Sequence, residues 1–328
     1  MQLKELISKI ESVAPPELAF DWDRCGIQVA GTRQEINRMV MALDPDEQTI
    51  KQCLSQKAQF ILTHHPLSIK PRLPDKIDSF YRIVKDLLKT NTILYSAHTS
   101  LDCNPLGPSS WLAKELRLNQ VSVLKPTTTI KAVELSFHHP LPVTPEDLPC
   151  RQFILRWEQS PEGLINSVAV PCNKVDLFIS GIKQQYWPVF FVKSYFPELD
   201  QQFGLGFKGR LPQPVPFETF IHLLKKILGV ENTVLAGTPP KTVHSVSCCP
   251  GSGGDLAMDA LSQDSDIFIT GDLKYHQAQE AARLGCVLDV GHFILEEKMM
   301  FQWFTDLKEE LEGIDLKFIE GSSPLRVV

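Results

Sequence analysis

Short apolar runs alternate with amphipathic runs along most of the chain, and this alternation restricts the folds open to it. In the first part, NRMVMALD, QFILTHH and TILYSAH resemble buried strands, whereas EQTIKQCLSQ, FYRIVKDLLK and SSWLAKELRL have helical spacing. The alternation returns in VHSVSCC, DIFITG and CVLDVGH, before a long helix predicted over about residues 293–311. Strands that alternate with helices predict an α/β fold, with helices on the faces of each sheet. We therefore expect two α/β lobes.

Residues 131–202 have a different composition, rich in proline and in aromatic residues near short strand-like runs. We interpret this segment as a smaller α+β insertion. The glycine-rich stretch GLGFKG, at 204–209, marks the return to the α/β pattern. The predicted domains are an N-terminal lobe at 1–130, the insertion at 131–202, and a C-terminal lobe at 203–328 that completes the functional site.

Charge and cysteine content exclude several classes of protein. The chain has 33 basic and 39 acidic residues, a formal net charge of -6 and no run of Lys and Arg, so nucleic acid is disfavoured as a partner. The first 13 residues have the spacing of an amphipathic helix and not of a signal peptide, and no apolar run approaches the roughly 18 residues of a membrane span. The 8 cysteines form no CxxC pair. We expect a reduced, cytoplasmic protein without a membrane partner.

The stretch FILTHHPL, at 60–67, places two adjacent histidines at the end of a predicted strand. Neighbouring strand residues point to opposite faces, so His64 and His65 can serve one pocket only if the chain turns there, and Pro66 favours such a turn. Such a pair suits two different metal ions better than one. The alternative is a histidine pair satisfied by backbone hydrogen bonds. A second HHPL copy, at 138–141, has no carboxylate at ligand spacing, and we interpret it as coincidence.

Two further strand ends offer donors for a metal. His98 and Asp102 follow the predicted strand TILYS; Asp102 could bridge two cations or cap a helix, and His98 could be a ligand, an orienting group or an acid/base. His292 and Glu296 are four residues apart at a helix start, which puts both on one face as a metal clip or as a solvent-facing pair. Glu297 points about 100° away and is the poorer ligand.

The five candidate ligands are therefore His64, His65, Asp102, His292 and Glu296. Three imidazoles and two carboxylates suit zinc, manganese, iron or nickel and are too nitrogen-rich for calcium.

Two glycine- and charge-rich stretches could contact a substrate. In CCPGSGGDL, the backbone at Gly251 and Gly253 could hold an anion, or the stretch could be a tight turn between strand and helix. In TGDLKYHQAQEA, Asp272, Lys274 and Tyr275 could contact substrate and His276 could support the chemistry, or these residues could cap and cover a helix.

Taken together, THHPL, AHTSLD, CPGSGG, TGDLKYHQAQEA and DVGHFILEE, in this order, resemble the NIF-three-like family, also called GTP cyclohydrolase I type II homologs. PPELAFDWDRCGIQV is similar to the family's Trp-Asp-x-x-Gly-Leu segment. The resemblance covers both lobes. It implies two divalent first-row ions held by the five candidate ligands and a ring-shaped homo-hexamer whose sites face an internal cavity. The chain departs from the pattern at 108–110 and at Cys249, and the insertion is not matched to the PII-like or CutA-like domains of some members.

Three functions follow from this sequence. The first is a metal-dependent hydrolase of a nucleotide such as GTP, or of a phosphorylated small molecule, with His98 or His276 moving protons. The second is a metal chaperone or storage protein. The third is an interaction scaffold, which exposed aromatics at Tyr186, Trp187, Phe190 and Phe191 would favour. Five ligands are few for two ions and leave positions for water, which favours the hydrolase.

Overall fold

The computed structural model describes residues 1–105, 107–138, 144–148, 151–161, 165–185, 191–195 and 200–325 as a mixed α/β fold with three sheets. The predicted fold class is confirmed. The chain forms two compact units, of which one combines Met1–Lys125 with Gly204–Val328 and the other is Pro126–Phe203. No helix in these ranges is long and apolar enough to cross a membrane.

The first sheet of the larger unit has five strands in the order β1-β4-β3-β2-β15. Its strands are β1 (Gly26–Val29), β2 (Arg38–Ala42), β3 (Phe60–Thr63), β4 (Ile93–Ser96) and β15 (Asp315–Phe318). Strands β15, β2, β3 and β4 are parallel, and β1 pairs with β4 in the antiparallel direction. The parallel strands therefore deliver their carboxyl ends to the same edge of the sheet.

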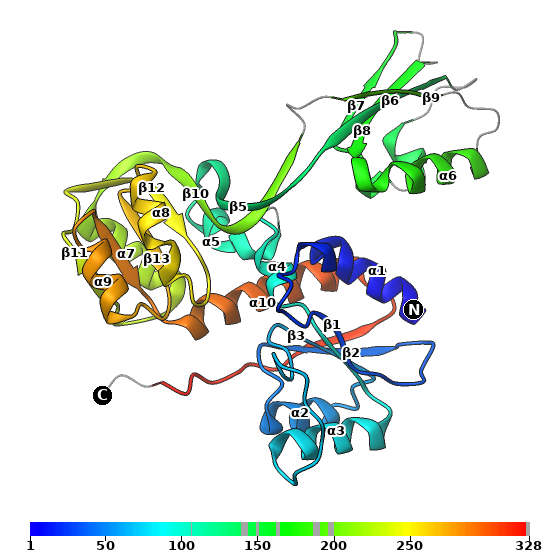
Figure 1. Cartoon of the computed structure of the whole chain (residues 1–328), viewed down its shortest axis with the longest axis horizontal. Coiled ribbons are helices and arrows are strands. Elements are labelled where there is room, and N and C mark those ends of the chain that lie inside the picture. Colours follow the sequence, from blue (N-terminus) through cyan, green and yellow to red (C-terminus); the bar gives the residue numbers. More distant parts are fainter. Residues whose placement is uncertain are drawn as a thin grey trace. The chain divides into compact units, whose positions relative to one another are not determined.

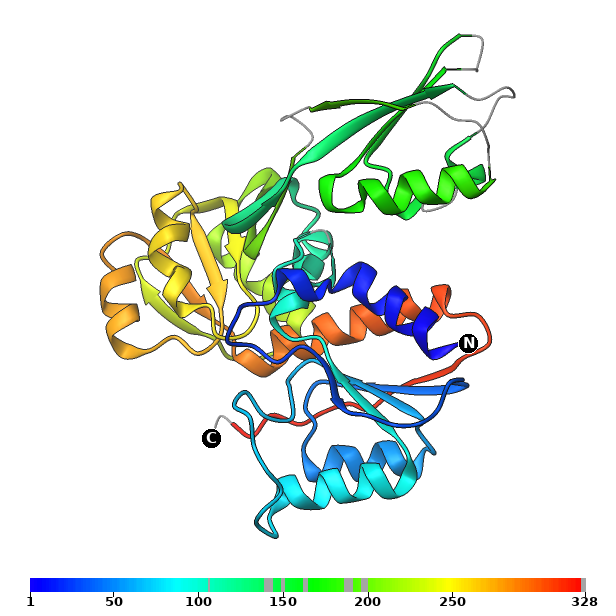
Figure 2. The same ribbon diagram turned by 45° about the vertical axis from the view of Figure 1, so that its right-hand side comes forward.

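Helices cover both faces of this sheet, as Figures 1 and 2 show. On one face lie α1 (Leu3–Val13) and α10 (His292–Glu310), and on the other lie α2 (Glu47–Ser55) and α3 (Ser79–Thr90). Residues of β2 alternate accordingly: Met39 and Met41 pack in the core with α1 and α10, whereas Val40 packs with α2 and α3. All three are fully buried, as the apolar run in the sequence predicts.

The second sheet of the larger unit has six strands in the order β11-β14-β13-β12-β10-β5. Its strands are β5 (Asn119–Ile130), β10 (Gln201–Pro216), β11 (Val234–Gly237), β12 (Thr242–Cys248), β13 (Ile267–Thr270) and β14 (Cys286–Asp289). Strands β12, β13 and β14 are parallel, and the helices of this lobe are α7 (Phe217–Leu228), α8 (Ala257–Ser262) and α9 (Tyr275–Ala281). Two short helices, α4 (Thr99–Asp102) and α5 (Trp111–Glu115), follow β4 in the first lobe.

Each sheet of the larger unit contains one strand from a distant part of the sequence. Strand β15 follows the whole second lobe in sequence, yet it pairs with β2, where Asp315 also forms an ion pair of 2.7 Å with Arg38. Conversely, β5 precedes the insertion but belongs to the second sheet beside β10. Each sheet of the larger unit therefore combines segments that are distant in the sequence.

Helix α10 packs in one continuous hydrophobic core that extends through the larger unit. Its buried residues Leu295, Met299 and Trp303 belong to a cluster that contains Met39 of β2 and Ile267 of β13. Because this core includes both sheets, the two lobes are packed together, and the start of α10 is held at a fixed place between them.

The smaller unit has a four-stranded antiparallel sheet, in the order β7-β8-β6-β9, and one α-helix among its described residues. These elements are β6 (Ala132–His138), β7 (Arg156–Gln159), β8 (Ile165–Pro171), β9 (Phe191–Tyr195) and α6 (Val175–Gln185). Phe137 and Phe178 anchor its separate core. The backbone of His138 ends β6, whereas His139, Tyr186, Trp187 and Phe190 lie outside the described residues.

Candidate metal centre

The five predicted ligands lie together in the larger unit, where strand ends of its two sheets meet. His64 and His65 follow β3, Asp102 ends α4 just after β4, and His292 begins α10 just after β14. Glu296 lies one helical turn beyond His292, and its carboxylate reaches all three histidines. The site thus depends on both lobes.

A turn of the backbone allows the two adjacent histidines to face one site. The N–H groups of His64 and His65 both donate to the Leu43 carbonyl, at 3.2 and 3.1 Å. The Ser96 hydroxyl donates to the His64 carbonyl at 2.7 Å, and the Thr63 hydroxyl donates to the His65 carbonyl at 2.9 Å. The two ring centroids are consequently only 5.0 Å apart.

Each of the three ligand imidazoles is fixed through its Nδ1 atom. The Nδ1 of His64 lies 3.0 Å from the Ala97 carbonyl, that of His65 lies 2.7 Å from Asp44 Oδ1, and that of His292 lies 2.6 Å from Asp272 Oδ2. Carbonyl and carboxylate oxygens only accept hydrogen bonds, so Nδ1 carries the proton in each ring. The Nε2 lone pair of the neutral ring then remains for a metal, in an arrangement common among metal-binding histidines.

The Nε2 atoms and the two carboxylates converge. Glu296 Oε2 lies 3.1 Å from His65 Nε2 and 2.8 Å from His292 Nε2, while His64 Nε2 lies 3.6 Å from oxygens of both Asp102 and Glu296. His64 Nε2, Asp102 Oδ1 and Glu296 Oε2 are buried and have no partner with hydrogen-bond geometry. Buried polar atoms are rarely left unsatisfied, and ligand atoms of His65, His292 and Glu296 lie within 4.8 Å of one another, close enough to hold a divalent cation. The residues present therefore fit a metal ion of the borderline first-row class.

The charge of the cluster also favours a cation. Burial by itself would raise the pKa of Glu296, but the adjacent histidines hold it well below its usual range, whereas burial raises the pKa of Asp102. Burial lowers the pKa of His65, yet Asp44 and Glu296 outweigh this and raise it to about 10. Contact with Glu296 raises the pKa of His292 to about 9. Without a metal, the cluster holds protons on its histidines, so protons and metal compete for the same nitrogens.

His98 lies beside this cluster with its own carboxylate partner. Its ring centroid is 5.2 Å from that of His64 and 5.5 Å from that of His65, and these three histidines could themselves hold an ion. The Nδ1 of His98 lies 2.9 Å from Asp23 Oδ1, and the side chain of Asp23 is fully buried. Burial would raise the pKa of Asp23, but hydrogen bonds from His98 and Thr99 hold it far below its usual range. The Asp23 carboxylate thus fixes the ring of His98 beside the cluster.

Two aspartates that support these histidines were missed by the sequence analysis. Asp44 follows β2, the strand next to β3, and Asp23 lies within the segment PPELAFDWDRCGIQV. Asp44 occupies the same kind of position, at the end of a parallel strand, that led to His64 and Asp102. Its place at a strand end is the sequence signal that could have identified Asp44.

The residues predicted to bind substrate have varied surroundings. A Cβ atom at Gly251, where φ is +65°, would collide with Glu296 Oε1, so this glycine makes room for a candidate ligand. The Gly253 N–H donates to the Thr270 hydroxyl at 3.0 Å. Asp272 holds His292. Lys274, Tyr275 and His276 are exposed at the start of α9, and among the residues that the structure describes their side chains form no hydrogen bond or ion pair with the five candidate ligands.

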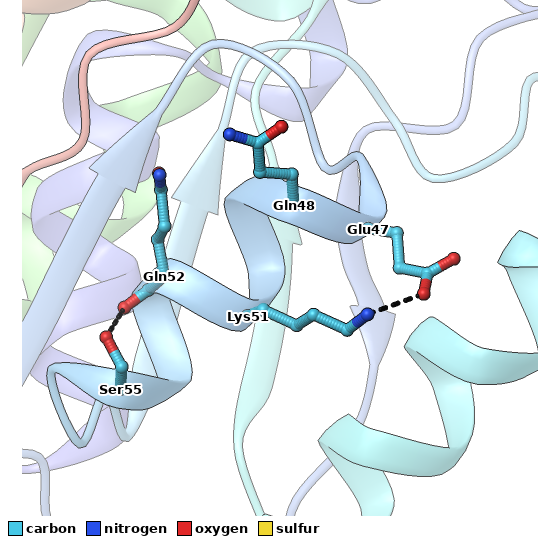
Figure 3. A pocket seen from close by; sticks show the side chains of 5 residues that line it. All are labelled: Glu47, Gln48, Lys51, Gln52 and Ser55. Atoms are coloured by element: carbon cyan, nitrogen blue, oxygen red, sulfur yellow. Dashed lines mark hydrogen bonds and ion pairs between the residues drawn. The ribbon is translucent and has the colours of Figure 1, made fainter.

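A separate surface depression lies over α2 and has no part in this cluster. Glu47, Gln48, Lys51, Gln52 and Ser55 line it, and Lys51 pairs with Glu47 at 2.7 Å (Figure 3). The depression contains none of the predicted site residues. Its lining is that of a solvated helix face.

Comparison with known proteins places these features in context. The family model of Duf34/NIF3 (NGG1p interacting factor 3) matches residues 1–324. A protein of Clostridium perfringens named GTP cyclohydrolase 1 type 2 homolog is 26% identical, with 100% of both chains covered. A protein of Halalkalibacterium halodurans with the same name is 27% identical over 94% of this chain and 92% of its own. The crystal structure of a Bacillus cereus protein related to NIF3 has a TM-score of 0.79 at 22% identity, covering 100% of this chain and 99% of that chain.

Proposed function

The chain belongs to the Duf34/NIF3 family, and from this premise we propose that it is a metal-dependent hydrolase of a nucleotide or another phosphorylated small molecule. The observation that carries the proposal is the buried Glu296 carboxylate, whose oxygens lie 2.8 to 3.6 Å from the Nε2 atoms of His64, His65 and His292. Ligand atoms of His65, His292 and Glu296 lie within 4.8 Å of one another, close enough to hold an ion. A structural role alone would not require such a set. Several relatives are named GTP cyclohydrolase 1 type 2 homolog, which makes a purine nucleotide such as GTP the first substrate to test.

We assign two divalent first-row ions to His64, His65, Asp102, His292 and Glu296. Glu296 has oxygens close to three imidazoles, and Asp102 lies close to His64, so these five side chains would supply the donors for the ions. Zinc, manganese, iron and nickel all suit this donor set. Divalent ions at such a site lower the pKa of water and polarise phosphoryl or carbonyl oxygens.

The remaining residues have roles of positioning and proton transfer. Asp44 and Asp272 orient His65 and His292. His98 is the proposed proton carrier, because Asp23 fixes its Nδ1 while its ring faces the cluster. His276, the other predicted candidate, lies exposed on α9. Family resemblance also suggests a homo-hexameric ring, which we keep as part of the proposal.

The decisive experiment measures metal content per chain in protein purified without an affinity tag, followed by assays against GTP and a panel of nucleotides and phosphoesters. We expect about two ions per chain and metal-dependent turnover. A His98→Gln variant should retain its metal and lose about 100- to 10,000-fold in turnover. Two freely exchanging ions without turnover on any substrate would favour metal storage or delivery instead, and absence of metal would refute the site.

A further inference from the structure

A large aromatic side chain stands exposed next to the proton carrier. Trp22 has 54% of its surface exposed, although most residues around the candidate centre are buried or half-buried. Its ring stacks on Phe20, with centroids 5.8 Å apart and planes inclined by 19°, and it meets His98 edge-on at 6.0 Å. One face of Trp22 is therefore supported from behind, and much of the ring remains accessible.

Hydrogen bonds on both sides of Trp22 hold its backbone in place. The Phe20 N–H donates to the Thr99 hydroxyl at 3.1 Å, and the Asp23 N–H donates to the Phe20 carbonyl at 2.9 Å. Asp23 in turn accepts from the Thr99 N–H at 2.9 Å and binds His98. The loop of Trp22 is thus tied to the start of α4, the same helix that presents Asp102. An aromatic ring held in this way is a preformed platform and not a flexible surface residue.

The platform is separated from the candidate metal centre by a single imidazole. The His98 ring lies 6.0 Å from Trp22 on one side and 5.2 Å from His64 on the other. A ligand with an anionic group at the metal centre would therefore extend past His98 onto Trp22. Single exposed aromatics are common on protein surfaces, but this one lies within reach of a ligand at a candidate active site.

We propose that Trp22 is a stacking subsite for a planar heteroaromatic ring, so that the substrate is a nucleotide and not a simple phosphoester. This inference rests on the proposed function and narrows its substrate class. Stacking between a base and an aromatic side chain is tolerant of the base and makes a substantial contribution to binding. The ring would lie with its edge near His98, where the proposed proton carrier can reach it.

The test compares two ligands, one with the base and one without it. Calorimetric titration of the metal-loaded protein with GMP and with ribose 5-phosphate measures the contribution of the base. We expect tighter binding of GMP, and the Trp22→Ala variant should bind GMP about 10- to 100-fold more weakly while ribose 5-phosphate binding stays within about 2-fold. Trp22→Phe retains an aromatic face and should recover most of the lost affinity.

Phe301→Ala provides a control, because Phe301 is similarly exposed at 49% and also contacts a neighbouring ring, with its centroid 5.8 Å from that of Phe304. This variant should bind both ligands with the affinity of the wild-type protein. Equal affinity of the wild-type protein for GMP and ribose 5-phosphate would overturn the subsite, as would equal losses for both ligands in Trp22→Ala. If Trp22→Ala changes the mass of the assembly in solution but leaves the GMP affinity unchanged, the subsite is also overturned, and Trp22 is then a contact between copies of the chain. Metal content, measured on the same samples, reports separately on the proposed metal centre.

Discussion

Gly251 offers the sharpest test of the candidate metal centre, because an added methyl group would displace one ligand. Its backbone has φ of +65°, and a Cβ atom there would collide with Glu296 Oε1. Gly229, at the end of α7, has a similar φ of +73°, but a Cβ atom there would meet nothing within 4 Å. The pair therefore separates backbone strain from loss of the ligand.

The magnitudes follow from the two geometries. Alanine in the left-handed region costs about 1–2 kcal/mol, and reduced freedom of the unfolded chain returns about 0.4–1 kcal/mol, so backbone strain should lower the unfolding free energy of each variant by about 1 kcal/mol. Only Gly251→Ala should also push the Glu296 carboxylate aside. Loss of a partner that merely orients a ligand weakens metal binding about 10- to 100-fold, so displacement of a ligand should weaken it at least as much.

Chemical denaturation of the metal-free variants measures the first quantity, and competition with a chelator of known affinity measures the second. Gly229→Ala should keep wild-type metal affinity within about 2-fold, the margin expected for a remote site. If both variants bind metal as the wild type does, Glu296 is not a ligand in the arrangement described here. If both lose metal equally, the effect comes from general destabilisation and the argument from Gly251 fails.

Three further predictions use the same site. Asp272→Asn should weaken metal binding about 10- to 100-fold, since His292 Nδ1 loses its charged acceptor; unchanged affinity in the chelator competition would contradict this. The raised pKa values of His65, about 10, and His292, about 9, stabilise the metal-free protein fully below about pH 6.5, and this contribution is lost as the pH rises through 9 and 10. Denaturation should therefore show the metal-free protein losing stability between pH 6.5 and 10, while its metal affinity rises over the same range. Asp23→Asn should lower the free energy of unfolding by roughly 2 kcal/mol or more, because its buried carboxylate accepts from His98 and the Thr99 N–H; a smaller loss would mean that this network is not stabilising.

The candidate ligands could be predicted because their signals are local. His64 and His65 follow an apolar strand and precede a proline, and the spacing of His292 and Glu296 fixes their common helix face. Asp44 shares the strand-end signal of His64, but the role of Asp23 could not be inferred in this way, since a single aspartate in a loop usually forms a turn or a helix cap. Its role depends on which strand or helix lies alongside, and that is a property of the tertiary fold.

The sheets show the same division between local and distant information. The strand β15 was not predicted from the sequence, and its pairing with β2, more than 270 residues earlier, has no local signal. Local periodicity can predict that a segment is a strand, but it does not predict which strands pair with it. Lys274, Tyr275 and His276 illustrate the converse, because a motif that marks the family places these side chains in solvent at α9.

The late arrival of β15 has a consequence for biosynthesis. While the ribosome makes the second lobe, β2 has no partner on one side, and its backbone edge and apolar side chains remain open to unwanted pairing. The first sheet gains its last strand only when residue 318 has emerged, and the metal centre gains Glu296 only when the start of α10 has emerged. A nascent chain of this protein therefore passes most of its translation with an unpaired sheet edge and an incomplete metal centre, the condition in which partly folded chains are most prone to aggregate.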